Sequence, residues 1–222
     1  MGTITENKDF RCSVCGQISA QPVITEQDRA SGAPDLDLRP AGAQRNNMRY
    51  WAMKCPECGY CCTTLDIPFD DSREYLESDE YKTCGGITVT NEYAERLIKR
   101  ALVFVRDHTY KDAVRSYLAA AWALDDDKDD RHAKECRLAA VKLMDGHPAA
   151  FKGDNNFLLL KADLLRRAGD FERVVREFAG KAFPSQIMTA IAFFEVHLSA
   201  SGDSAAHRAD EVPGVSAASQ GD

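Results

Sequence analysis

The residues whose types and spacing could do chemistry are two pairs of cysteines. Both pairs belong to C-x-x-C-G motifs, at residues 12–16 and 55–59. Such a motif folds into a tight turn, called a knuckle, that presents two thiolates to one metal ion, and its glycine supplies the left-handed backbone of the turn. Four thiolates make a complete tetrahedral ligand set. The sequence therefore predicts one metal ion bound by Cys12, Cys15, Cys55 and Cys58.

The same ligand set does not decide whether the bound metal is Zn2+ or iron. Zinc is the metal expected for an intracellular ribbon, although four thiolates in a tetrahedron accept iron as well. Because four protein ligands leave no position for water or substrate, we expect a structural site and not a hydrolytic one. An alternative from another class is a rubredoxin-like electron carrier, since C-x-x-C-G followed by C-P-x-C-G also describes an iron-thiolate centre.

Three further cysteines could alter the ligand set. Cys61 and Cys62 directly follow the second knuckle, and either could replace a ligand; the competing interpretation makes them small buried side chains of a strand. Cys84, before a Gly-Gly pair, is a third candidate. All five histidines lie after the knuckles, which leaves no Cys-His nucleophile or mixed zinc site. We therefore expect no enzymatic activity.

The distribution of charge limits the partners. The 222-residue chain has a formal net charge of −7, and residues 1–65 hold seven Lys and Arg against seven Asp and Glu, so the acidic excess lies in the rest of the chain. An acidic surface repels nucleic acid. The run from residue 39 to 54 is basic and aromatic with no acid, and it supplies the candidate nucleic-acid contacts Arg45, Arg49, Tyr50 and Trp51.

Structural roles compete with function for several of these charged and aromatic residues. Trp51 precedes a knuckle, where we expect an aromatic ring to pack over the ribbon, and Arg39 could pair with Asp35 or Asp37. The acidic run at residues 125–130 lacks the glycine and glutamate positions of an EF-hand loop. We expect it to be a solvated turn that caps the next helix.

The distribution of cysteines and the hydropathy of the chain predict where in the cell the protein is located. Six of the eight cysteines fall in the first 62 residues, as for metal binding and unlike a disulfide framework, which favours a reducing cytoplasm. The first ten residues lack a basic region followed by an apolar run, and the most apolar helix candidate, residues 187–198, is short and carries Glu195 and His197. We expect neither secretion nor a membrane span.

The elements that must position the knuckles form a small N-terminal domain. Short apolar or aromatic segments lead into each knuckle, and one leaves the second, a pattern typical of a zinc ribbon, predicted at residues 1–67. Its spacer at residues 16–54 contains several Pro and Gly residues and should be largely loop. Residues 68–89 are predicted to be a connector with a short helix at residues 72–82.

The rest of the chain predicts a helical domain at residues 90–200, so the fold class is α+β, mainly α. Thr90 is a good N-cap, and apolar residues then recur at helical spacing in six segments with short turns, which implies antiparallel neighbours. The segments are 94–105, 113–121, 136–144, 157–165, 171–178 and 187–198. Residues 201–222 have few bulky apolar side chains, and a disordered tail is expected.

Part of the helical region resembles tetratricopeptide (TPR) repeats. Tyr110-x2-Ala113-x3-Tyr117-x2-Ala120 and a later stretch around Phe171 place small and aromatic residues as those repeats do, although Tyr110 and Phe171 lie 61 residues apart, which is no multiple of the repeat length. With the knuckles and the Ala-Ala-Trp helix at residues 120–122, the chain resembles an uncharacterised bacterial family of zinc-ribbon proteins with TPR-like helices. That resemblance covers roughly residues 10–180 and implies an architecture without an activity.

These features lead to one functional expectation. The chain should be a cytoplasmic, non-enzymatic scaffold protein, with a structural zinc ribbon and a helical groove that binds a protein partner. The partner and the oligomeric state stay open. The rubredoxin-like iron carrier and a nucleic-acid-binding ribbon are the alternatives.

Overall fold

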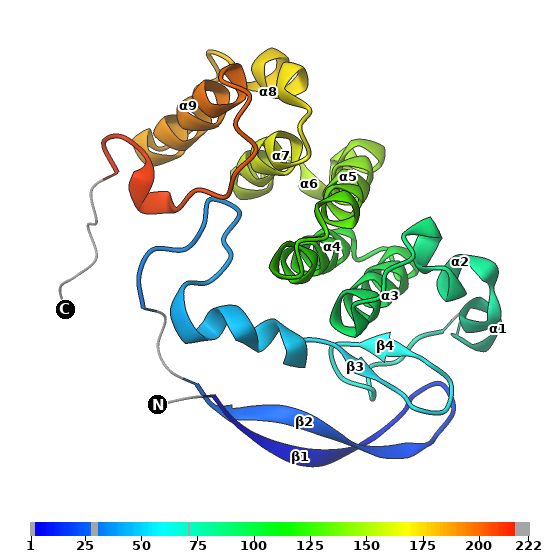
Figure 1. Cartoon of the computed structure of the whole chain (residues 1–222). Helices are drawn as coiled ribbons and strands as arrows, with labels where there is room; N and C mark the ends of the chain where they lie inside the picture. The colour runs from blue at the N-terminus through cyan, green and yellow to red at the C-terminus, as the bar shows by residue number, and fades with distance from the viewer. Residues whose placement is uncertain (1–2, 28–30, 71, 216–222) are drawn as a thin grey trace.

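The computed structural model describes residues 3–27, 31–70 and 72–215. The protein has an α+β fold that is mainly α, as predicted. Figure 1 shows the helices between Glu92 and Ala200 following one another in an arc, with two small sheets at the N-terminal end of that arc. Among these described residues, no helix has both the length and the apolar composition needed to cross a bilayer.

Both sheets are antiparallel hairpins, and each cysteine knuckle forms the turn of one hairpin. In the first, β1 (Ile4–Arg11) pairs with β2 (Ile18–Glu26). In the second, β3 (Met53–Lys54) pairs with β4 (Cys61–Cys62). The hairpin geometry therefore places the two thiols of each knuckle at the tip of a two-stranded ribbon.

The spacer between the knuckles is more ordered than predicted. The strand β2 and the 3-10 helix η1 (Gly42–Tyr50) occupy much of the segment that was expected to be loop. Aliphatic and β-branched residues favour β2, and Pro22 within it is tolerated because a two-stranded ribbon has only edge strands. The prediction was wrong here because it gave Pro more weight than its edge position warrants.

The six helical segments predicted between residues 94 and 198 are all helical, whereas the helix predicted at residues 72–82 is divided at Ser78 and the short helix at residues 148–151 was not predicted. The side chain of Asn91, and not the predicted Thr90, caps the first long helix by accepting from the N–H of Ala94. Asp129 caps the helix after the acidic run by accepting from the N–H of His132, as expected. The bounds are α1 Ser72–Glu77, α2 Asp79–Lys82, η2 Cys84–Gly86, α3 Glu92–Arg106, α4 Tyr110–Asp126, α5 Asp130–Gly146, α6 Pro148–Phe151, α7 Asn155–Arg167, α8 Phe171–Phe178, α9 Gln186–Ala200 and η3 Ala209–Glu211.

Consecutive long helices pack on one another, and small residues of α4 allow a close approach. Helix α4 packs against both α3 and α5, and farther along the chain α8 packs against α9. Ala113, Ala120 and Ala121 are fully buried in these contacts. The ring of Tyr110 stacks on that of His147, with centroids 3.7 Å apart. The repeat-like spacing thus marks tightly packed hairpins, while a TPR-like array stays a prediction.

One apolar cluster joins the ribbon to the helices. Tyr60 and Leu65, which follow the second knuckle, share this cluster with Tyr81 of α2 and with Leu102 and Val103 of α3. The cluster therefore contains residues of the predicted ribbon (1–67), connector (68–89) and helical domain (90–200). The division into those domains stays a prediction, because apolar burial crosses both boundaries.

A segment that follows β2 is held to the helices by buried charges. The side chain of Arg39, which is 2% exposed, forms an ion pair with Asp126 at 2.5 Å. Among the residues that the structure describes, the expected ion pair with Asp35 or Asp37 is not formed. The contact of Arg39 with the Asp37 side chain is a hydrogen bond from its backbone N–H. Asp125 accepts from arginines of α5 and α7. The expectation of a solvated acidic turn is therefore wrong for Asp125, which arginines distant in sequence cover, while Asp126 pairs with Arg39 and stays about half exposed.

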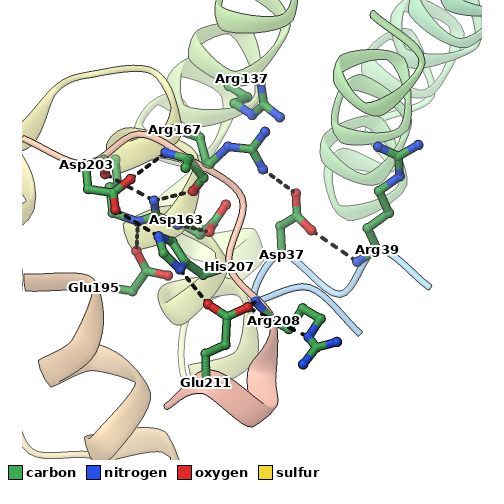
Figure 2. Close-up of polar contacts among 12 residues, drawn as sticks. Asp37, Arg39, Arg137, Asp163, Arg167, Glu195, Asp203, His207, Arg208 and Glu211 are labelled. Carbon is green, nitrogen blue, oxygen red and sulfur yellow. Dashed lines mark hydrogen bonds and ion pairs between the residues drawn. The ribbon is translucent and has the colours of Figure 1, made fainter. Parts of the chain in front are cut away.

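The C-terminal segment is ordered against the rest of the protein up to residue 215. The prediction of a disordered tail from residue 201 was wrong for this part, and residues 216–222 lie outside the described residues. Arg166 donates to the carbonyl oxygens of Asp203 and Ala205, at 3.2 and 2.7 Å. Asp35 and Arg208 form an antiparallel β-bridge, so this segment lies beside the segment after β2 (Figures 1 and 2). Hydrogen bonds to backbone groups order most of the segment, and Val212, which is 2% exposed, adds a buried apolar side chain.

A buried cluster of three charges lies under this C-terminal segment. Arg166 donates to Glu195 at 2.6 Å and to Asp163 at 2.8 Å, and all three side chains are at most 3% exposed. Each carboxylate has one oxygen without a partner among the described residues. Burial, and then the charge of Asp163, raises the pKa of Glu195 to about 8. The folded protein therefore holds a proton here at neutral pH, which lets two carboxylates share one guanidinium.

This cluster predicts how stability depends on pH. Between pH 4.5 and about 8 the folded state binds one proton that the unfolded state releases, so the free energy of unfolding should fall as pH rises, by at most about 1.4 kcal/mol per pH unit. Glu195→Gln is neutral throughout and should remove this slope, whereas the exposed Glu172→Gln should follow the wild type. Urea unfolding at pH 5.5 to 8.5 measures both, and parallel curves for wild type and Glu195→Gln would contradict the shared proton.

Candidate metal centre

The two knuckles have the same backbone geometry. Gly16 and Gly59 have positive φ angles of 76° and 74°, in the left-handed region that only glycine adopts readily. The N–H of Gly16 donates to the carbonyl of Cys12 at 2.9 Å, and that of Gly59 donates to the carbonyl of Cys55 at 3.0 Å. The glycine in each motif is thus required by the turn, as the sequence predicts.

The hairpins bring all four predicted cysteines together. Their sulfur atoms lie within 4.8 Å of one another. The Sγ atoms of Cys12 and Cys58 are 3.6 Å apart, and so are those of Cys15 and Cys55. A tetrahedral site with metal–sulfur bonds of about 2.3 Å places its sulfurs about 3.8 Å apart. The cluster therefore has the size of a four-thiolate metal site, and the cysteines are free and not disulfide-bonded.

The electrostatics of the cluster favour a bound cation. Cys12 and Cys55 are buried, while Cys15 and Cys58 are half-buried. Burial raises the pKa of Cys12 and of Cys58. At Cys15 burial also raises the pKa, but a backbone hydrogen bond from Gln17 and the neighbouring thiols outweigh it and the net shift is downward. Four thiolates in so small a volume repel one another, so full deprotonation requires a metal ion at their centre.

Residues outside the motifs hold the second knuckle in place. The hydroxyl of Tyr81, on α2, donates to the carbonyl of Gly59 and accepts from the N–H of Cys61, both at 2.9 Å. The backbone N–H of Ser13 in the first knuckle donates to the carbonyl of Leu65, a residue that follows the second hairpin in the chain. The sequence analysis missed Tyr81, because a tyrosine in a short connector helix carries no local signal of this contact.

The other cysteines lie outside the cluster. Cys61 and Cys62 are fully buried in β4, and Cys61 donates through its thiol to the carbonyl of Gly59. Burial raises the pKa of Cys61 to about 12, and it raises that of Cys84 as well. Their positions agree with the interpretation of Cys61 and Cys62 as small buried side chains of the outgoing strand.

The candidate nucleic-acid contacts have other neighbours within the protein. Arg45 pairs with Asp35 at 2.9 Å. The guanidinium of Arg49 lies 5.8 Å from the ring of Tyr50, and its Nε donates to a backbone carbonyl within η1. Trp51 packs edge-on against Trp122 of α4 at 6.2 Å and not over the ribbon as expected. Nucleic-acid binding through these residues stays a prediction.

Comparisons of the chain with protein-family models, with curated proteins and with solved structures give no match. The four-cysteine cluster and the adjoining helical region agree with the coarse architecture that the sequence predicts, a zinc ribbon followed by helices. Membership of the bacterial zinc-ribbon family stays a resemblance.

Two serine substitutions separate a ligand from a buried neighbour. Cys55→Ser should abolish metal binding and make the N-terminal hairpins sensitive to protease, because losing one ligand removes much of the coordination free energy. Cys61→Ser is the matched control, since Cys61 is also fully buried but lies outside the cluster. Elemental analysis and limited proteolysis measure both. Full metal content in Cys55→Ser, or its loss in Cys61→Ser, would refute the assigned ligand set.

Proposed function

We propose that the chain is a non-enzymatic, cytoplasmic scaffold protein that binds one structural Zn2+ ion through four cysteines and a protein partner through its helices. The observation that carries the proposal is the convergence of the four sulfur atoms within 4.8 Å. Four protein ligands fill a tetrahedral coordination sphere and leave no position for a substrate. This favours a structural role for the metal.

The exposure of the first hairpin supports a structural role for the metal. Seven of the eight residues of β1 are exposed, and in β2 only Gln21 is buried. An isolated two-stranded hairpin without an apolar face is marginal in water. Structural zinc in small domains supplies roughly 10 to 16 kcal/mol of apparent binding free energy. Phe10 and Val23 make partly buried apolar contacts with the cluster around Tyr60, and coordination by Cys12 and Cys15 would add most of what anchors this largely exposed hairpin.

A groove on the last long helix supports partner binding. It has a volume of about 730 Å³ and is lined by residues of α9, by Phe183 and Pro184 before that helix, and by Pro213. Phe193 in its wall is 71% exposed, and Ile187 on the same helix is 57% exposed. Exposed aromatic side chains beside a groove are typical of surfaces that bind an apolar segment of another protein.

Metal analysis with an absorption spectrum tests the first half of the proposal. Protein purified from its source should be colourless and contain one equivalent of zinc. A red protein that bleaches reversibly on reduction would contain iron and would favour the rubredoxin-like electron carrier instead. Protein that contains neither metal at stoichiometry would refute a structural metal centre.

Paired surface substitutions test the second half. Phe193→Asp should weaken binding of a specific partner by tenfold or more, because it places a charge on the apolar wall of the groove. Leu138→Asp is the control, since Leu138 is an exposed apolar residue of α5 outside the groove. Quantitative pull-down with the full chain compares them. Partners that bind wild type and both variants equally would rule out this groove as the binding surface.

A further inference from the structure

A second cavity lies between the segment after η1 and helices α3, α4 and α7. Its volume is about 710 Å³, within the range of roughly 300 to 1,000 Å³ typical of small-molecule sites. Neither the metal centre nor the groove on α9 uses it. The side chains that matter for the inference are Trp51, Arg100, Arg115, Trp122 and Phe157.

The walls of this cavity are largely aromatic and aliphatic. Trp51 and Trp122 meet edge-on at 6.2 Å, and Leu118 and Leu160 also face the space. Flat apolar molecules fit such walls, because stacked and edge-on contacts add to the burial of apolar surface. These are the only two tryptophans in the chain, so intrinsic fluorescence reports directly on this cavity.

Arg100 supplies a buried positive charge at the same place. It is 7% exposed, and its Nε donates to the hydroxyl of Ser116 at 3.0 Å while Nη1 donates to the carbonyl of Trp51. Within the described part of the chain, no carboxylate forms an ion pair with it. Burial lowers the pKa of Arg100 to about 10. A buried cation is normally paired, and here the protein supplies neutral acceptors alone.

Among the described residues that line the cavity, one is a carboxylate, and it is already engaged. Asp37 accepts from the N–H of Arg39 at 3.1 Å, and Arg167 lies 3.6 Å away (Figure 2). Asp37 also accepts from the indole N–H of Trp122 at 2.6 Å. Burial raises the pKa of Asp37 to about 6. Its charge therefore has its own cation and donors. The charge of Asp112 acts on Arg100 from a distance, but Asp112 pairs with Arg115, so Arg100 has no carboxylate in contact among the described residues.

A second guanidinium stands beside the cavity. Arg115 is 61% exposed, forms an ion pair with Asp112 at 2.9 Å, and lies over the ring of Phe157 at 5.0 Å. Exposed pairs of this kind are weak, so the guanidinium can turn toward an anion that enters. The cavity thus combines flat apolar walls with one buried and one exposed cation.

We propose that this cavity binds a small organic anion that joins a carboxylate or phosphate group to a flat apolar body. The anionic group would pair with Arg100, with Arg115 as its second contact. The body would lie against Trp51 and Trp122. Such a ligand supplies the counter-charge that the fold leaves missing and fills a volume that the protein leaves open.

Three nitroaromatic probes test this with the full, metal-loaded chain. The two anions are 4-nitrobenzoate and 4-nitrophenyl phosphate, and 4-nitrobenzamide is the neutral control. We expect at least one anion to quench tryptophan fluorescence and to bind at least tenfold more tightly than the amide in calorimetry. The preferred anion identifies the head group. Equal affinity for all three, or heat of binding without quenching, would overturn the proposal.

Charge reversal beside the cavity provides the matched variants. Arg115→Glu changes an exposed residue, so the fold should persist, and we expect it to weaken binding of the preferred anion at least fivefold. Arg131→Glu, at an 80% exposed position of α5 that does not line the cavity, should change the affinity less than twofold. Arg100→Gln should remove the preference for an anion over the amide. If circular dichroism shows that this variant is unfolded, Arg115→Glu decides, and an unchanged affinity there would overturn the proposal.

Discussion

The convergence of four cysteine sulfurs is the constraint on which the N-terminal half of the structure depends. Two hairpin tips separated by a long spacer approach until their sulfurs lie within 4.8 Å. Apolar packing contributes little to this for the first hairpin, because strand β1 is almost entirely exposed and only partly buried side chains such as Phe10 and Val23 reach the apolar cluster. Four thiols placed so closely are stable as thiolates only around a cation. A bound metal ion would therefore neutralise the thiolates and at the same time fix the position of the hairpin.

The influence of the centre extends into the helices through a short chain of contacts. Tyr81 forms hydrogen bonds with Gly59 at the end of the second knuckle and with Cys61 just after it, and it is also part of the apolar cluster that includes Leu102 and Val103 of α3. Farther away, buried charges replace apolar contacts: Arg39 pairs with Asp126, and Arg166 holds the C-terminal segment through two backbone carbonyls. Buried charges of this kind specify which loop lies where, because an unpaired one is costly.

The groove on α9 and the cavity beside Trp51 and Trp122 have different chemistry and suggest different ligands. The groove on α9 is apolar and ends in exposed aromatics such as Phe193, which favours an apolar segment of a partner protein. The cavity beside Trp51 and Trp122 adds Arg100, a buried cation without an ion pair among the described residues, which favours a small anion. The two proposals, a protein partner at the groove and a small organic anion in the cavity, therefore concern separate places in the structure.

The sequence by itself determined the features whose causes are local. The knuckles follow from C-x-x-C-G, because Gly16 and Gly59 must adopt positive φ. The six long helices follow from apolar periodicity, and they extend beyond the predicted segments by at most six residues at either end. Contacts between distant residues were decided only by the tertiary structure. The indole of Trp122 reaches Asp37 across 85 positions, and the tail expected to be disordered is ordered up to residue 215 by Arg166 and by its bridge to Asp35. Periodicity and composition carry no information about which buried charge meets which, since that pairing depends on how the packed elements arrange their faces in space.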